Sequence, residues 1–150
     1  MAVIDLDTLA ASNGALLGVD PGTKTLGLAI SDHTRLIASP LDTIRRTKFR
    51  DDAEILLDLY DKNHVSALVV GLPVNMDGSL GPRTQSVRDF CTNLMKLRDI
   101  PVFFWDERLS TMAVTRTMLA DDMSRKKRAQ NVDKLAAAYI LQGVLDRLRF

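Results

Sequence analysis

The stretch LLGVDPGTKTLGLAISD, from Leu16 to Asp32, decides how the chain begins to fold. Two apolar runs flank a polar Asp-Pro-Gly-Thr corner, whose residue types are typical of tight turns. Short apolar runs joined by tight turns predict antiparallel strands. The first run ends on Asp20, so an acid stands where a buried strand meets a turn. Such a corner is either a simple hairpin turn or a site that holds a metal ion or a phosphate.

The segments beyond this corner predict a mixed α/β sheet. A third strand is expected over 35–40, which completes an antiparallel meander with 15–20 and 26–32. Helical spacing of apolar residues follows over 49–63, and the β-branched run VSALVVGL, 65–72, is typical of a strand buried on both faces. The remaining elements are expected to be a helix from Pro82, a strand over 100–107, a helix over 110–122, a basic connector over 123–131 and a closing helix from 132. This order predicts three antiparallel strands continued by parallel ones, with helices on the faces of the sheet.

Length and composition favour one globular domain. The chain has 150 residues and is 46% hydrophobic, which is enough for one core. Residues 1–14 are expected to be an N-terminal tail and 15–150 the domain. The net charge of +1 excludes a polycation, so nucleic-acid binding would require a local basic surface. The single cysteine, Cys91, allows no intramolecular disulfide, and no apolar run approaches the ~20 residues that span a bilayer, so we expect a cytoplasmic protein.

Three acids fall where a functional site would form. Asp20 ends the first strand, Glu107 follows Asp106 at the end of a later strand, and Asp133 lies at the start of the closing helix. Ligands of such sheets bind beyond the carboxyl ends of the strands, where these acids would meet. Clustered carboxylates raise each other's pKa unless a cation such as Mg²⁺ neutralises them. Taken singly, each acid also has a structural explanation as a turn residue, a solvated strand end or a partner of the helix dipole.

Basic and hydroxyl residues near the same edge predict contacts with phosphates. Thr23 and Lys24 lie in the corner, and Arg108 directly follows the acid of the later strand. Arg83 lies beside a helix start, where an anion is favoured. A dense basic run is either a solvated connector or a contact with a nucleic-acid backbone, and it consists of Arg125, Lys126, Lys127 and Arg128.

Four stretches resemble the signature regions of the YqgF family of RuvX-type proteins, which are related to the RuvC Holliday junction resolvases. They are GVDPGTKTLGLAISD, VVGLPVNMDGSLGPR, DERLS and VDKLAAAYILQGVLDRL, and the resemblance runs from about Leu16 to Leu148. It implies an RNase H-like fold, with a five-stranded mixed sheet flanked by helices. It also implies an acidic triad for Mg²⁺ or Mn²⁺, and the positions that match this triad are Asp20, Glu107 and Asp133. Asp106 is expected to support the triad from outside it.

The resemblance implies a metal-dependent nuclease that hydrolyses phosphodiester bonds. Its substrate would be either the 5′ end of precursor 16S rRNA, with the ribosome as a possible partner, or branched DNA. Two other functions stay open. The corner DPGTKTLG also resembles the phosphate loop of actin-like ATPases, and the chain could instead be a non-catalytic RNA-binding factor in ribosome assembly. Either a monomer or a homodimer is compatible with these functions.

Overall fold

The computed structural model describes residues 3–75, 77–109 and 125–149, with side chains of the last range described from Asp133 onward. In chain order the elements are α1 (Leu6–Ala11), β1 (Ala15–Pro21), β2 (Thr25–Ser31), β3 (Ala38–Arg45), α2 (Phe49–Lys62), β4 (Val65–Leu72), α3 (Pro82–Leu97), β5 (Val102–Asp106), the 3₁₀ turn η1 (Glu107–Leu109) and α5 (Arg125–Arg149). None of the helices in these ranges is long and apolar enough to cross a membrane.

The five strands form one mixed sheet in the order β3-β2-β1-β4-β5. β1, β2 and β3 pair antiparallel, whereas β4 pairs parallel with both β1 and β5. This arrangement confirms the predicted meander continued by parallel strands. Because β1, β4 and β5 are parallel to one another, their carboxyl ends lie at the same edge of the sheet.

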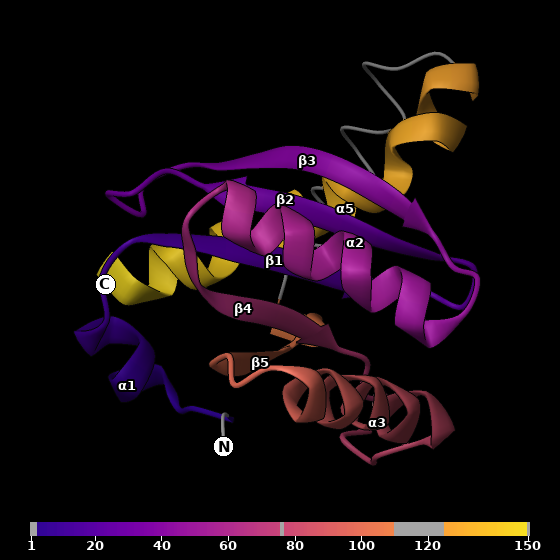
Figure 1. Cartoon of the computed structure of the whole chain (residues 1–150), viewed down its shortest axis with the longest axis horizontal. Helices are drawn as coiled ribbons and strands as arrows, with labels where there is room; N and C mark the ends of the chain where they lie inside the picture. The colour runs from indigo at the N-terminus through magenta and orange to yellow at the C-terminus, as the bar shows by residue number, and fades with distance from the viewer. Residues whose placement is uncertain (1–2, 76, 110–124, 150) are drawn as a thin grey trace.

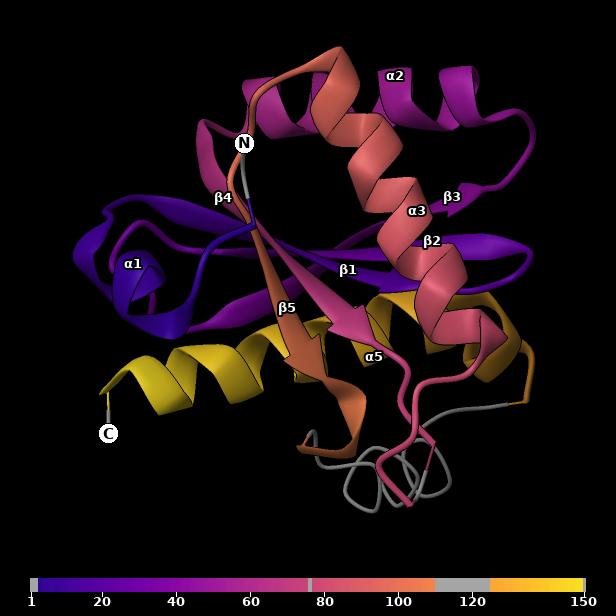
Figure 2. The ribbon, with the colours of Figure 1, turned by 90° about the horizontal axis from the view of Figure 1, so that it is seen from below.

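Helices cover both faces of the sheet, and each face has its own apolar core. α2 and α3 lie on one face, and α5 crosses the other (Figures 1 and 2). The first core holds residues such as Leu17, Val19 and Leu56, and the second holds Leu16, Val69 and Leu141. Leu16 and Leu17 thus face opposite sides, as the alternation of a strand buried on both faces requires.

The third strand lies later in the chain than the sequence predicts, over Ala38–Arg45 and not 35–40. The preceding turn is longer than expected because the carboxylate of Asp32 accepts the N–H groups of Leu36 and Ile37, at 2.9 and 3.0 Å. Arg35 adopts a left-handed conformation with φ of 59° in this turn. The apolar pair Leu36 and Ile37 resembles the start of a strand but lies in the turn and is exposed.

The closing helix begins at Arg125 and not at 132. Arginine, lysine, alanine and glutamine all favour helix, so the stretch RKKRAQ continues the helix towards its N-terminus instead of forming the expected connector. Asp133 consequently lies more than two turns inside α5, where the helix dipole no longer explains it. The helix expected over 110–122 lies outside the described residues.

The residues before β1 carry more structure than the expected tail. α1 begins after Asp5, whose side chain accepts the N–H of Thr8 at 2.8 Å, and its Leu9 is fully buried in the second core. Val3 forms a bridge with Val102 of β5, and the N–H of Ile4 donates to the Val102 carbonyl at 2.9 Å. An apolar residue at the helical position that meets the core explains why this segment packs on the fold.

Two glycines let α5 lie directly against the sheet. A Cβ at Gly27 of β2 would stand 2.0 Å from the carbonyl oxygen of Asp133, and a Cβ at Gly18 of β1 would stand 2.9 Å from Cβ of Leu141. No side chain fits between helix and strand at these points. The backbone of α5 near Asp133 is therefore in contact with the backbone of β2.

Replacement of Gly27 by alanine is expected to push α5 away from the sheet, because the new methyl group would overlap helix backbone. We expect a loss of about 2 kcal/mol or more in the free energy of unfolding, the scale of an overpacked core. Chemical denaturation measures this loss.

Gly143→Ala is the matched control on the same helix. Its Cβ would meet Trp105 at 3.6 Å, an ordinary contact, and alanine favours helix by up to about 1 kcal/mol. Equal stability of the two variants would contradict the packing described above.

Candidate active site

Asp20 faces α5 at the carboxyl end of β1. Because Leu17 and Val19 point into the first core and Gly18 faces Leu141, strand alternation puts the Asp20 side chain on the α5 face. Its partner in the β1–β2 register is Gly27. Val19 pairs with Val70 on the other side, so the next residue of β4, Gly71, lies beside Asp20. Asp20 is therefore flanked on both neighbouring strands by residues that have no side chain.

Two other acids occupy the space above these glycines. A Cβ at Gly71 would stand 3.1 Å from Oε1 of Glu107, so the Glu107 side chain covers β4 at this point. Asp133 lies over Gly27, and its Oδ2 accepts a hydrogen bond of 2.5 Å from Oγ1 of Thr25. The structure thus brings together Asp20, Glu107 and Asp133, the three acids singled out by the sequence.

The electrostatics of Asp20 reflect this crowding. Burial raises the pKa of the Asp20 carboxyl to about 7, with further contributions from the charge of Glu107, a side-chain hydrogen bond with Glu107 and the charge of Asp133. Arg83 acts in the opposite direction and lowers this pKa. Near neutral pH, the cluster therefore holds a proton that a cation could replace.

The donor chemistry of the cluster fits a hard divalent ion, since carboxylate oxygens are the ligands that Mg²⁺ prefers. The positions of these carboxyl groups fit the coordination of a metal ion less closely. Within the described ranges, no three His, Cys, Asp or Glu side chains are grouped as they would be around a metal ion. Asp20 and Glu107 are instead hydrogen-bonded to each other. Binding of an ion would require the loss of that bond and of its proton.

Two arginines hold the turn that follows Asp20. Nη2 of Arg83, at the start of α3, donates to the carbonyl of Pro21 at 2.9 Å. Nη1 of Arg46, just after β3, donates to the carbonyl of Gly22 at 2.6 Å. The guanidinium of Arg46 also lies over the ring of Phe90, 5.4 Å from its centroid. These contacts fix the backbone on which Asp20 is placed.

Asp106 lies apart from the cluster and is neutralised by its neighbour. Arg108 donates to both of its carboxylate oxygens, with the shortest contact at 2.6 Å, and the backbone N–H of Arg108 donates at 2.9 Å. Hydrogen bonds from Arg108 lower the pKa of Asp106. Trp105 packs with the second core, so alternation turns Asp106 towards the other face. Arg108 is engaged here, and its predicted contact with phosphate stays a prediction.

The other residues predicted to contact phosphates lie in two places, the β1–β2 turn and the first turn of α5. Thr23 and Lys24 are exposed in the β1–β2 turn. The side chains of the basic run lie outside the described residues, although its backbone forms the first turn of α5; these residues are Arg125, Lys126, Lys127 and Arg128.

Sequence reasoning missed the residues that support the acids. Thr25 holds Asp133, Arg46 holds the turn, and Gly27 and Gly71 make room for the acids. Strand alternation in the sequence could have indicated that Gly27 and Gly71 face the same side of the sheet as Asp20. It could not have indicated that Asp133 lies over Gly27 or that Glu107 lies over Gly71.

The fold of this chain is shared with known nucleases of the RuvC type. The chain superposes on RuvC of Thermus thermophilus bound to a Holliday junction substrate, with a TM-score of 0.55 and 14% identity over 90% of this chain and 96% of that chain. A second structure of Thermus thermophilus RuvC gives a TM-score of 0.53 at the same identity and coverage. At this identity the likeness concerns the fold alone, which is RNase H-like.

Residues 14–147 match the RuvX family, described as Holliday junction resolvase, and the chain belongs to this family of nucleases. A relative from Paramagnetospirillum magneticum is 66% identical over 131 residues, which cover 87% of this chain and 84% of the relative. A relative from Phenylobacterium zucineum is 56% identical over 149 residues, which cover 98% and 96%. Both relatives are named pre-16S rRNA nuclease. Nucleases of this class generally use divalent metal ions.

The clustering of the acids predicts a dependence of stability on pH. The pKa of Asp20 is raised in the folded protein, so the fold favours the protonated acid and loses stability as pH rises from about 4 towards 8. Asp20→Asn removes this titration. Without metal, we expect the variant to gain stability over the wild type as pH rises, by an amount on the order of 4 kcal/mol.

Thermal unfolding in EDTA at several pH values measures this difference. Asp58→Asn, at an exposed position on α2, is the matched control and should follow the wild type throughout. If the curves of Asp20→Asn and the wild type run parallel, Asp20 is not the strained acid described here.

Proposed function

We propose that this protein is a metal-dependent nuclease that hydrolyses phosphodiester bonds in the 5′-end maturation of precursor 16S rRNA. The observation that carries the proposal is the convergence of Asp20, Glu107 and Asp133 at the carboxyl ends of the parallel strands. The names of the relatives support the choice of substrate, since proteins 56–66% identical to this chain are named pre-16S rRNA nuclease. A cytoplasmic location suits this substrate.

Asp20, Glu107 and Asp133 would hold Mg²⁺ or Mn²⁺. The chemistry that such an ion supplies when bound is the activation of water and the stabilisation of the leaving oxygen. Asp20 would be the central ligand because it lies between the other two acids, on a strand flanked by Gly27 and Gly71. Water would be the nucleophile.

The neighbouring residues position this cluster and the substrate. The hydroxyl of Thr25 orients the carboxylate of Asp133 through its hydrogen bond. Arg83 holds the turn and offsets part of the negative charge at Asp20. Thr23 and Lys24 are exposed on that turn, where a hydroxyl and an ammonium group suit a phosphate.

Branched DNA is the second candidate substrate, because the family to which the chain belongs is described as Holliday junction resolvase. A symmetric junction would be cut most naturally by a two-fold dimer, whereas an rRNA end requires only a monomer. The substrate and the oligomeric state are therefore linked questions that one assay can address.

The decisive experiment offers two labelled substrates side by side with Mg²⁺ or Mn²⁺: a 5′-extended 16S precursor and a four-way DNA junction. We expect metal-dependent cleavage of the precursor. Asp20→Asn, Glu107→Gln and Asp133→Asn should each lower the rate about 100-fold or more, because each keeps its shape but loses a ligand charge. Asp58→Asn is the control for the general loss of an acid.

Each other outcome has a definite meaning. Cleavage of the junction alone would move the assignment to branched DNA. Binding of RNA in EDTA by a folded protein that cleaves neither substrate would instead favour a non-catalytic assembly factor. Equal activity of Asp20→Asn and the wild type would remove Asp20 from the mechanism.

A further inference from the structure

The basic side chains of this protein divide into paired and unpaired groups. Arg98, Arg108 and Arg149 each form an ion pair with an aspartate. Other basic residues are exposed and form no ion pair within the part of the chain that the structure describes. Four of them lie on the β1–β2 turn or on the segment that leads from the end of β3 into α2. We call these four the basic strip, and they are Lys24, Arg45, Lys48 and Arg50. Three of its members come from the sequence RRTKFR, residues 45–50, which joins β3 to α2.

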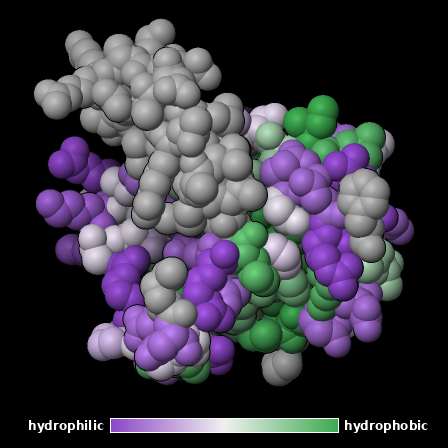
Figure 3. Space-filling model, turned by 180° about the vertical axis from the view of Figure 1, so that it is seen from behind, coloured by the Kyte–Doolittle hydropathy of each residue, from purple (hydrophilic) through white to green (hydrophobic). Residues whose placement is uncertain are grey.

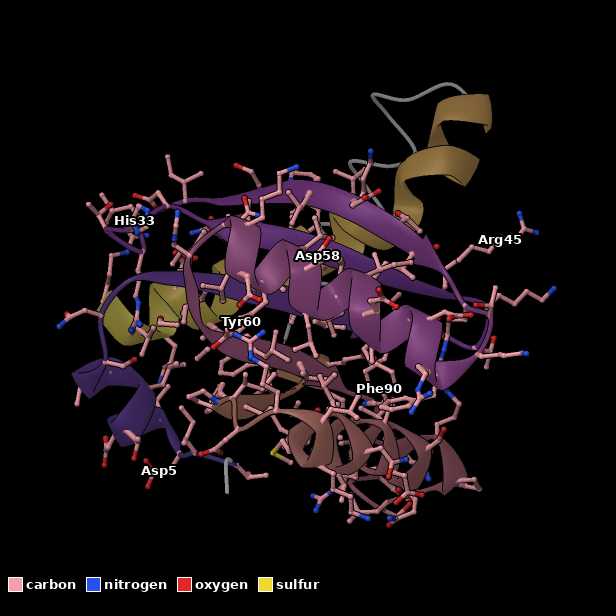
Figure 4. The ribbon with its side chains drawn as sticks, in the orientation of Figure 1. Asp5, His33, Arg45, Asp58, Tyr60 and Phe90 are labelled. Carbon is pink, nitrogen blue, oxygen red and sulfur yellow. The ribbon has the colours of Figure 1, made fainter. Side chains whose placement is uncertain are left out.

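Two members of the basic strip, Lys24 and Arg45, lie next to the acid cluster, and Lys48 and Arg50 follow Arg45 along the chain into α2. The N–H of Arg46 donates to the carbonyl of Lys24 at 2.8 Å, so the β1–β2 turn and the segment after β3 lie side by side. Arg45 pairs with Thr25 in the β2–β3 register, and Thr25 also holds Asp133. Figure 4 shows Arg45 at the end of β3, with its side chain projecting outward. Seen from behind, hydrophilic side chains project from this same end of the molecule, on the left in Figure 3.

The neighbours of the basic strip have structural roles that its members lack. Arg46 holds the Gly22 carbonyl and covers Phe90. Asp52 is buried and accepts the backbone N–H of Thr47 at 3.1 Å. No comparable hydrogen bond or ring contact engages Lys24, Arg45, Lys48 or Arg50 through its side chain in the described structure. Packing therefore does not account for these four charges.

Two of the charges work against the helix that they adjoin. Lys48 is the N-cap of α2 and makes no side-chain cap hydrogen bond, and Arg50 lies in the first turn. Cations at the N-terminus of a helix oppose its dipole, typically by about 0.3–1 kcal/mol each. Asp51 and Asp52 in the first turn and Glu54 after them offset part of this charge, but the four cations between residues 45 and 50 outnumber these three acids. A role outside folding would explain why the chain keeps them.

We propose that the basic strip binds the sugar–phosphate backbone of the substrate on the β3–α2 side of the acid cluster. This inference rests on the proposed nuclease function and adds the path that the substrate takes. The contact would read charge and not base identity. The aromatic ring within the segment, Phe49, packs edge-on against Phe90 at 5.5 Å between centroids and is not free to stack on a base. Recognition of this kind is independent of sequence and weakens strongly with salt.

The test uses the triple variant Arg45→Gln, Lys48→Gln, Arg50→Gln and the 5′-extended 16S precursor as the probe. Binding is measured in EDTA at several salt concentrations, so that cleavage does not intervene. Loss of three phosphate contacts should reduce the slope of log K against log salt by about 2 to 3 and lower affinity about 10- to 100-fold at low salt.

The matched control removes three exposed charges near the opposite end of the sheet, by Lys62→Gln, Lys96→Gln and Arg147→Gln. These residues lie in the last turns of α2, α3 and α5. The control should bind with a slope within experimental error of the wild type. If both triple variants lose affinity equally, general charge and not the basic strip governs binding, and the inference is overturned.

A crosslinking measurement locates the contact directly. Cys91 is buried, so a cysteine introduced at Lys48 can be labelled selectively with a photoreactive group. Crosslinks to the precursor from position 48, and none from a cysteine at Lys62, are expected. Their absence in a wild-type background that binds and cleaves would refute the basic strip and leave the nuclease intact. Failure of the wild type to bind any nucleic acid would instead refute the proposed function.

Discussion

The contact on which the rest of the structure depends is the approach of α5 to the sheet at Gly18 and Gly27. Helix and strand meet there through backbone atoms, since a methyl group at Gly27 would overlap the carbonyl of Asp133. The contact fixes the height of α5 over β1 and β2, and with it the position of Asp133. On β4, the missing side chain of Gly71 likewise leaves the space that the side chain of Glu107 occupies. The absence of three side chains thus creates the space in which Glu107 and Asp133, from distant parts of the chain, can meet Asp20.

This geometry has an electrostatic cost that the surrounding residues only partly offset. Asp20 is half-buried beside two other carboxyl groups, and its pKa rises to about 7 as a result. Thr25 donates a hydrogen bond to Asp133, and Arg83 contributes positive charge near Asp20. Thr25 is neutral, and the charge of Arg83 lowers the pKa of Asp20 without cancelling its rise. A buried carboxyl group whose pKa is raised by neighbouring acids is a common feature of sites that bind a cation.

Much of the fold could be predicted from the sequence because its signals are local. The run from Val65 to Leu72 and the helix from Pro82 appear in the structure where periodicity and the helix-start proline put them. The sequence places β3 too early because Leu36 and Ile37 resemble a strand, while hydrogen bonds to Asp32 hold them in a turn. It predicts that the three acids lie near one another, but it does not indicate Thr25 and Arg46, since their roles depend on partners that only the fold brings close. The basic strip gives no clear signal in the sequence because Thr47 and Phe49 interrupt its charges, whereas the run from Arg125 to Arg128 is uninterrupted.

Cations that lie beside the acid cluster can offset the repulsion between that cluster and an anionic substrate. A phosphodiester is an anion, and three carboxyl groups repel it. The net charge of the whole chain is only +1, which cannot provide the attraction at a distance. Attraction must therefore come from cations close to the cluster that are not already neutralised, and in the described structure Arg98, Arg108 and Arg149 are each paired with an acid. Unpaired cations next to Asp20, on the turn at Lys24 and the segment after β3, can hold the backbone while the cluster itself is reserved for the ion. Substrate and metal would then be bound by adjacent surfaces of opposite charge, which meet where Arg45 pairs with Thr25 and Thr25 donates its hydrogen bond to Asp133.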